Sequence, residues 1–299
     1  MEKLFAEHAI KRPILNGEVI MSSNSDLAER MKLYELSEAG RKLMPLLPVI
    51  ARLDGRAFHS FCKGLKRPYD ERMSRLMIDC TKYLVQETNA SCGYTQSDEI
   101  TLGWFAADFD CEIFFDGRIS KMLSILAAMQ SVYFNKNLDK HLPEEYSAKM
   151  PTFDCRVWCV PNAIEGANAF LWREHDATKN SISMAARTYF SHKQVENKNG
   201  PQMQEMLWKE EGINWNDYPA FFKRGTFVQR KKTMKPFTVE EMDRLPSKHK
   251  ARTSPADSLF FERTEYAELD MPPFNKVVNR PGVIFFGEEP RLQVAEAAA

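Results

Sequence analysis

The chain has 299 residues, of which 43% are apolar and 27% are charged, proportions typical of a globular protein with a large core. Its 41 basic and 41 acidic residues leave no net charge, so binding to nucleic acid would require a local basic patch. The N-terminal residues lack a secretory pattern, and no apolar run approaches the roughly 18 residues that cross a bilayer. The 6 cysteines are scattered and expected to stay reduced. These features predict a cytoplasmic protein without a membrane segment.

The first part of the chain shows helix and strand patterns in turn. Residues 1–45 are expected to form an N-terminal extension with a short amphipathic helix at 26–36. An apolar strand follows over 46–54 and ends in an Asp-Gly pair. After Pro68 a long helix is predicted, because apolar residues recur at helical spacing over 73–84.

Two further strands are predicted on either side of a turn at Ser97-Asp98. A second long helix follows Gly117, and a strand with partly alternating apolar residues covers 153–160. The order over residues 46–160 is therefore β-α-β-β-α-β, which predicts a ferredoxin-like, palm-like catalytic core of the α+β class. In this topology the first and third strands pair at the centre of the sheet.

The pattern changes after residue 160. Residues 161–287 are expected to form a C-terminal extension of helices and strands. It includes one long or broken helix over 162–191 and a turn that enters a strand over 219–228. Residues 288–299 are predicted to be a disordered tail.

Carboxylates occur where the predicted strands end. Asp54 ends the first strand, and Asp98 lies in the turn between the second and third strands. Because the first and third strands pair, we expect Asp54 and Asp98 to be neighbours, although they are far apart in the sequence. Mg²⁺ prefers hard oxygen ligands and keeps positions for phosphate oxygens, so the pair predicts a metal site for a polyphosphate. Each aspartate alone is also compatible with an ordinary turn.

Residues beside this pair are expected to contact phosphate. Gly55 allows a close phosphate or a carbonyl turned toward metal. Ser97 can donate a hydroxyl, whereas Glu99 points to the opposite strand face if Asp98 points inward, where a salt bridge is the alternative role. Consecutive backbone amides that could cradle a triphosphate come from Arg56, Ala57, Phe58 and His59.

One segment of the C-terminal extension is strongly basic. Residues 223–235 contain no acid and carry the cations Lys223, Arg224, Arg230, Lys231, Lys232 and Lys235. A run of like charge is usually a solvated face. In a chain of zero net charge it also predicts contact with phosphates.

Four motifs in this order resemble the tRNA(His) guanylyltransferase family and its guanylyltransferase-like relatives. They are Asp54-Gly55-Arg56-x-Phe58-His59, Arg67-Pro68-x-Asp70, Gln96-Ser97-Asp98-Glu99 and Phe222-Lys223-Arg224-Gly225-Thr226. The resemblance extends over about 46–228. It implies a palm-like domain, with the tRNA and nucleotide contacts of the C-terminal part in 161–287.

The resemblance also implies a reaction. The 5′-monophosphate of a tRNA is activated with a nucleoside triphosphate, usually ATP. The 3′-hydroxyl of an incoming nucleotide, usually GTP, then attacks, so that the chain grows in the 3′-to-5′ direction. Two Mg²⁺ ions orient the nucleophile and neutralise phosphate charge. Relatives are commonly tetramers, so a homotetramer is expected.

Roles follow from the matching positions. The resemblance assigns metal binding to Asp54, the Gly55 carbonyl and Asp98, and catalysis to Asp54, Asp98 and Glu99. It assigns nucleotide binding to residues 54–59 with Ser97 and Asp98. Nucleotide or tRNA contacts are implied for Asn180 and Asn214. Contacts with tRNA phosphates are expected from Arg67, Lys223, Arg224, Arg230, Lys231 and Lys232.

One departure from the family pattern bears on the substrate. Aligned on Arg173 and Asp176, the His-Ile-Asn-Asn motif of members that act on tRNA(His) is here Thr178-Lys179-Asn180-Ser181. Only the asparagine remains, which favours the branch that repairs 5′-truncated tRNAs. Addition of G−1 to tRNA(His), a palm-type nucleotide cyclase and a non-catalytic RNA-binding protein are the alternatives.

Overall fold

The computed structural model describes residues 24–249 and 260–293. The chain divides into two compact units, Met1–Arg41 and Lys42–Ala299. In the first unit the helix α2 covers Asn24–Ala39, which includes the helix predicted at 26–36. No helix in the described ranges combines the length and apolar character that crossing a membrane requires.

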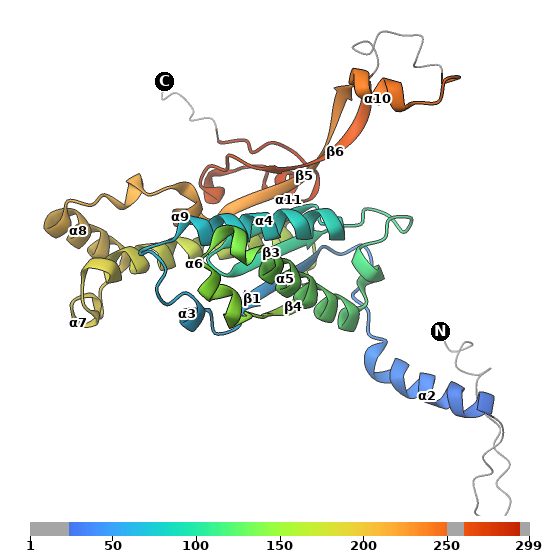
Figure 1. Cartoon of the computed structure of the whole chain (residues 1–299), viewed down its shortest axis with the longest axis horizontal. Coiled ribbons are helices and arrows are strands. Elements are labelled where there is room, and N and C mark those ends of the chain that lie inside the picture. Colours follow the sequence, from blue (N-terminus) through green and yellow to red (C-terminus); the bar gives the residue numbers. More distant parts are fainter. Residues whose placement is uncertain (1–23, 250–259, 294–299) are drawn as a thin grey trace, which may run out of the picture. The chain divides into compact units, whose positions relative to one another are not determined.

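In the second unit, the described strands form one six-stranded sheet with the order β4-β1-β3-β2-β5-β6, and all neighbours are antiparallel. The first four positions reproduce the predicted ferredoxin-like arrangement, with β1 beside β3 at its centre. Residues after 160 contribute two more strands, β5 and β6, to the same sheet (Figure 1). The strands are β1 (Val49–Gly55), β2 (Cys92–Gln96), β3 (Glu99–Trp104), β4 (Phe153–Cys159), β5 (Thr226–Pro236) and β6 (Phe260–Glu268).

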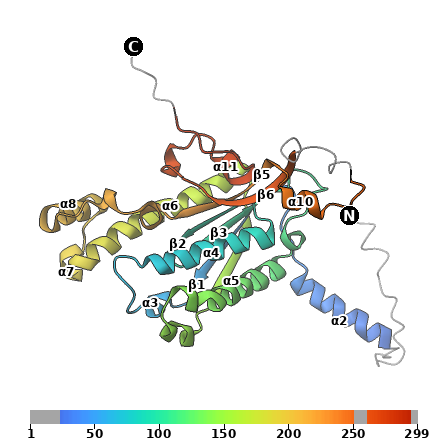
Figure 2. The ribbon, with the colours of Figure 1, turned by 45° about the horizontal axis from the view of Figure 1, so that its top comes forward.

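Helices cover both faces of this sheet (Figure 2). One face packs against α4 (Glu71–Thr88) and α5 (Ile119–His141), and the other packs against α6 (Ala163–Tyr189) and α11 (Arg280–Phe285). Shorter α-helices are α3 (Phe58–Phe61), α7 (His192–Val195), α8 (Gly200–Glu211), α9 (Ala220–Arg224) and α10 (Val239–Arg244). The 3₁₀ helices are η1 (Phe114–Gly117), η2 (Glu144–Lys149), η3 (Trp215–Asp217) and η6 (Phe274–Lys276).

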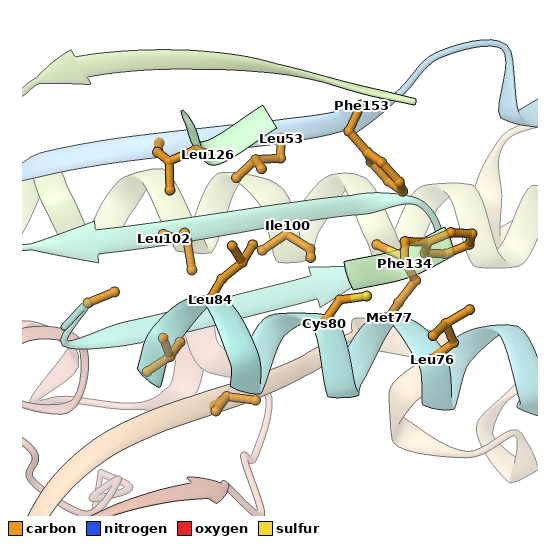
Figure 3. Packing of buried hydrophobic residues seen from close by; sticks show 14 of the residues in the cluster. Leu53, Leu76, Met77, Cys80, Leu84, Ile100, Leu102, Leu126, Phe134 and Phe153 are labelled. Atoms are coloured by element: carbon orange, nitrogen blue, oxygen red, sulfur yellow. The ribbon is translucent and has the colours of Figure 1, made fainter. Parts of the chain in front are cut away.

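The alternation of side chains along β1 explains these two layers. Leu53 points into the core beneath α4 and α5, where it lies with Leu84, Ile100 and Phe134 (Figure 3). Ile50 belongs to the core on the α6 side. Because successive strand residues point to opposite faces, the even-numbered residues of β1 face α6.

The helix beside the site has clear ends. The Asp70 side chain accepts a hydrogen bond of 3.1 Å from the Arg72 amide and caps the start of α4, while Asn89 ends the helix in a left-handed conformation. The predicted strand entry at 219–228 contains α9 before β5. Gly225 joins them with φ +78, and a Cβ there would lie 2.5 Å from the Thr95 carbonyl oxygen. This close approach holds α9 against β2.

The predicted tail differs from the structure at its start. The Glu288 amide donates a hydrogen bond of 3.1 Å to the Gly282 carbonyl, and Val277 pairs with Leu292 in an isolated bridge. Residues 288–293 are therefore held against α11 and the segment before it, and the prediction of disorder is wrong for them. Residues 294–299 lie outside the described residues.

Candidate functional site

The register of the sheet brings the predicted carboxylates together. Asp54 of β1 lies opposite Glu99 of β3, so the turn that contains Asp98 lies beside the end of β1. The predicted proximity of Asp54 and Asp98 is confirmed. On its other side Asp54 lies opposite Asp154 of β4. Asp154 was not among the predicted site residues, because only the β1–β4 register reveals that it lies beside Asp54.

Asp54 and Asp98 form an uncompensated pair of acids. Burial, and next the nearby Asp54 carboxylate, raise the pKa of Asp98, although the Ser97 hydroxyl donates a hydrogen bond of 2.8 Å to it. Within residues 24–249 and 260–293, no lysine, arginine or histidine lies within ion-pairing distance of either aspartate. The pair therefore presents negative charge that a bound cation would stabilise.

Glu99 is in a different electrostatic environment. The Arg173 guanidinium on α6 donates two hydrogen bonds, of 2.6 and 2.7 Å, to its two carboxylate oxygens, and Arg52 Nε lies 4.0 Å away. Burial raises the pKa of Glu99 and Arg173 opposes that rise. The salt bridge predicted as an alternative for Glu99 is thus present, and the charge of Glu99 is already balanced by the protein.

The loop after β1 is fixed by an aromatic ring. A Cβ on Gly55 would lie 2.2 Å from the Phe58 ring, which packs against Phe61, Phe134 and Phe153. The glycine is therefore required for this close approach.

The same loop offers fewer amides than predicted. The Arg56 amide donates a hydrogen bond of 2.9 Å to the Thr152 carbonyl, so this amide is not free to bind a phosphate. The next three amides, of Ala57, Phe58 and His59, have no acceptor among the described residues. Three of the four predicted amides remain for a ligand.

A cavity of about 420 Å³ opens beside the Asp98 turn. This volume is in the range of small-molecule sites. Five of the predicted nucleotide or phosphate contacts line it: Phe58, His59, Arg67, Ser97 and Asp98. Further walls come from the start of α4 and from α6 and α9, with side chains that the sequence analysis did not assign to a site: Tyr69, Met73, Met184, Arg187 and Phe221.

Other predicted contacts lie outside this cavity. Asn180 is exposed on α6 and its amide lies 3.5 Å from Asp176. Asn214 caps η3 by accepting a hydrogen bond of 3.1 Å from the Asn216 amide. Their contacts with nucleotide or tRNA stay predictions.

The structure does not gather the predicted basic residues into one patch. Lys223 and Arg224 lie in α9, whereas Arg230, Lys231, Lys232 and Lys235 lie along β5, where alternation directs neighbours to opposite faces. All six are also engaged by groups from elsewhere in the chain. The contacts are Lys223–Asn216 carbonyl, Arg224–Glu174 (3.8 Å), Arg230–Asn89 (3.4 Å), Lys231–Glu289 (2.8 Å), Lys232–Glu262 (2.8 Å) and Lys235–Glu265.

The donor set of the predicted metal site fits Mg²⁺ in kind. Asp54 and Asp98 supply hard carboxylate oxygens without a competing cation, and Gly55 can add its carbonyl. In the described ranges, no three His, Cys, Asp or Glu side chains are grouped closely enough to hold a metal by themselves. A cation here would therefore take further ligands from substrate phosphates or water, as Mg²⁺ usually does.

Comparisons with known proteins place the chain among related sequences and folds. The family model for tRNAHis guanylyltransferase matches residues 28–161. A solved bacterial tRNA(His) guanylyltransferase-like protein in complex with ATP is 37% identical, with a TM-score of 0.64 over 68% of this chain and 88% of that one. A second such protein, in complex with GTP, is 30% identical, with a TM-score of 0.63 over 84% and 94%.

A curated relative is similar over much of its length. The tRNA(His) guanylyltransferase of Debaryomyces hansenii is 29% identical over 216 residues, which cover 67% of this chain and 80% of the relative. The fold, the carboxylates at the strand ends and these likenesses lead to one assignment. This chain belongs to the tRNA(His) guanylyltransferase family, a family of nucleotidyltransferases.

Proposed function

We propose that the chain is a template-dependent 3′-to-5′ nucleotidyltransferase that repairs the 5′ end of tRNA. ATP first transfers its adenylyl group to the 5′-monophosphate and releases pyrophosphate. The 3′-hydroxyl of GTP or another nucleoside triphosphate then attacks the 5′-phosphorus and displaces AMP. The observation that carries this proposal is the uncompensated pair Asp54 and Asp98 at adjoining strand ends, beside a cavity of about 420 Å³.

Separate sets of groups would bind the metal ions and the phosphates. Asp54, Asp98 and the Gly55 carbonyl would hold two Mg²⁺ ions, which supply charge neutralisation at the reacting phosphates. The free amides of Ala57, Phe58 and His59 point to a triphosphate cradle in the same loop.

Other groups set the geometry around these ligands. Arg67 and Arg187 line the cavity and would bind phosphate oxygens. Glu99, held by Arg173, keeps a fixed carboxylate opposite Asp54. We assign Glu99 a catalytic role through this fixed charge beside the metal-binding pair.

The nucleotides of the proposed reaction are those seen with similar proteins. One bacterial guanylyltransferase-like structure is a complex with ATP and another is a complex with GTP. These match the activating and the incoming nucleotide of the proposal. The RNA substrate is proposed from the names of the relatives, which act on tRNA(His).

A second candidate is the addition of one guanosine, G−1, to tRNA(His). The family assignment favours it, whereas the sequence Thr178-Lys179-Asn180-Ser181 in place of His-Ile-Asn-Asn favours repair. Both activities use the same carboxylates and the same two chemical steps, so the substrate distinguishes them.

The test is a 5′-extension assay with two RNAs. One is a 5′-monophosphorylated tRNA that lacks its first nucleotides, and the other is a tRNA(His) that lacks only G−1; each is incubated with ATP, nucleoside triphosphates and Mg²⁺. Repair predicts extension of the truncated tRNA up to the end of the template strand, and Asp98→Ala abolishes it. Extension of tRNA(His) alone would support G−1 addition.

Two other results would contradict both candidates. Release of a cyclic nucleotide from GTP alone, without extension, would indicate a cyclase. Binding of tRNA without extension, unchanged by Asp98→Ala, would indicate a non-catalytic RNA-binding protein.

A further inference from the structure

An exposed tryptophan lies on the α6 side of the candidate site. Trp172 is 53% exposed, although a large aromatic side chain is usually covered by the fold. Two guanidinium groups stand against its ring, Arg173 at 4.6 Å and Arg52 at 5.5 Å from the ring centroid. The ring is thus held in place by the protein while half of it faces outward.

Both arginines connect this ring to the candidate catalytic acids. Arg173 is hydrogen bonded to Glu99, and Arg52 Nε lies 4.0 Å from Glu99. Arg52 also precedes Asp54 by two residues on the same face of β1. A single side chain, either Arg173 or Arg52, therefore lies between Trp172 and the Glu99 carboxylate.

Trp172 and the cavity lie at different positions along α6. From Trp172 the helix passes Arg173, which binds Glu99, and then reaches Met184, which lines the cavity. The helical path from residue 172 to residue 184 is about 18 Å at the usual rise of about 1.5 Å per residue. A nucleotide in the cavity and a base on Trp172 would thus contact different parts of α6.

A further cation lies on the strand next to Arg52. Arg156 of β4 lies opposite Arg52 in the sheet register, on the face shared with Trp158, which packs on the α6 side. Its side chain is 51% exposed and forms an exposed ion pair of 3.6 Å with Asp154. An exposed aromatic ring with cations beside it is the usual surface for stacking single-stranded nucleic acid.

We propose that Trp172 stacks a base of the RNA strand at the reacting 5′ end, with Arg156 contacting the neighbouring phosphate. This inference rests on the proposed function, because it requires RNA to approach the acids past Trp172 while a nucleotide occupies the cavity. Trp172 then positions the RNA end, and the cavity holds the nucleoside triphosphate.

The experiment measures RNA binding and nucleotide addition in the full chain. Binding is measured by fluorescence anisotropy of a labelled, 5′-monophosphorylated, truncated tRNA, and addition is measured as separate KM values for RNA and GTP. Trp172→Ala is expected to weaken RNA binding and raise the KM for RNA about tenfold or more, with the KM for GTP within about twofold. Trp172→Phe, which retains an aromatic ring, should restore most of the binding.

A second exposed tryptophan provides the control. Trp208 is 62% exposed on α8, so Trp208→Ala removes a surface tryptophan without touching the site. It should leave RNA binding unchanged, and thermal unfolding verifies that each variant is folded.

The outcomes separate this inference from the proposed function. If the wild-type protein binds RNA but does not extend it, the proposed function is contradicted. The comparison of RNA binding by wild type and Trp172→Ala then still tests the role of Trp172. The inference is overturned if Trp172→Ala binds RNA within about twofold of wild type, or if wild type binds no RNA. It is also overturned if the variant changes only the oligomeric mass, because Trp172 would then lie between copies of the chain.

Discussion

The ion pair between Glu99 and Arg173 offers a quantitative test of how the site is built. Arg173 donates two hydrogen bonds, of 2.6 and 2.7 Å, to Glu99, whose side chain is 13% exposed. In Arg173→Leu this carboxylate would be opposed only by Arg52 at 4.0 Å. Removing one partner of a buried ion pair costs about 3–5 kcal/mol. Because Arg52 remains, we expect a loss of about 3 kcal/mol in unfolding free energy at pH 8.

The loss should depend on pH, because Glu99 can take up a proton. Burial raises the pKa of Glu99 and Arg173 opposes that rise. Without Arg173, the folded-state pKa of Glu99 lies further above its unfolded value. The ionised group then destabilises the fold at high pH, and this penalty falls as the pH drops through the folded-state pKa. The difference between wild type and variant should be larger at pH 8 than at pH 5.

Urea unfolding at both pH values measures this difference. Arg75→Leu is the matched control, because Arg75 is half exposed and its partner Glu268 keeps a second contact with Lys82. We expect that control to lose less than about 1 kcal/mol at either pH. Two results would show that Glu99 is not a buried charge held by Arg173. One is a loss of unfolding free energy of less than about 1 kcal/mol in Arg173→Leu at pH 8. The other is an equal loss at both pH values.

Three further substitutions test neighbouring parts of the site. Asp98→Asn removes a carboxylate whose pKa is raised. In urea unfolding, the metal-free variant should therefore gain about 1 kcal/mol in unfolding free energy, while nucleotide addition is abolished. A destabilised variant would contradict this. The Arg72 side chain lowers the pKa of Asp70 to about 2, a contribution present above the unfolded pKa and lost as the pH falls toward 2. Arg72→Ala should therefore be less stable than wild type at pH 7, and the two should converge as the pH falls below 2; a constant difference would refute the linkage. Gly55→Ala places a Cβ 2.2 Å from the packed Phe58 ring, so unfolding free energy should fall by about 1–3 kcal/mol, and unchanged stability would show that the ring can move.

The core of the fold could be predicted because its elements have strong periodic patterns. The helical spacing of apolar residues after Pro68 and the apolar strand that ends at Asp54 gave the β-α-β-β-α-β order, and the order gave the pairing of β1 with β3. The additional strand β6 was not predicted. Its residues Phe260–Glu268 carry charged side chains on both faces, so no alternation of apolar and polar residues marks it.

The site was predicted where topology alone determines contact. Asp54 and Asp98 were predicted to be neighbours because the ends of β1 and β3 lie side by side in this topology. Arg173 was not identified as the partner of Glu99, because the rotation of α6 over the sheet is set by packing and not by local pattern. The basic segment was interpreted as one patch, since the sequence does not reveal that Glu262 and Glu289 lie beside its lysines.

The central claim is that Asp54 and Asp98 act together through a divalent cation to transfer a nucleotide to RNA. The most direct measurement is the rate of nucleotide addition to a truncated, 5′-monophosphorylated tRNA as the Mg²⁺ concentration is varied, for wild type and Asp54→Asn. We expect the wild-type rate to rise with Mg²⁺ and saturate, and the variant to be at least about a hundredfold slower at every Mg²⁺ concentration. An Asp54→Asn variant that is as fast as wild type, or a wild-type rate that is independent of Mg²⁺, would rule out catalysis by these two aspartates through a divalent cation.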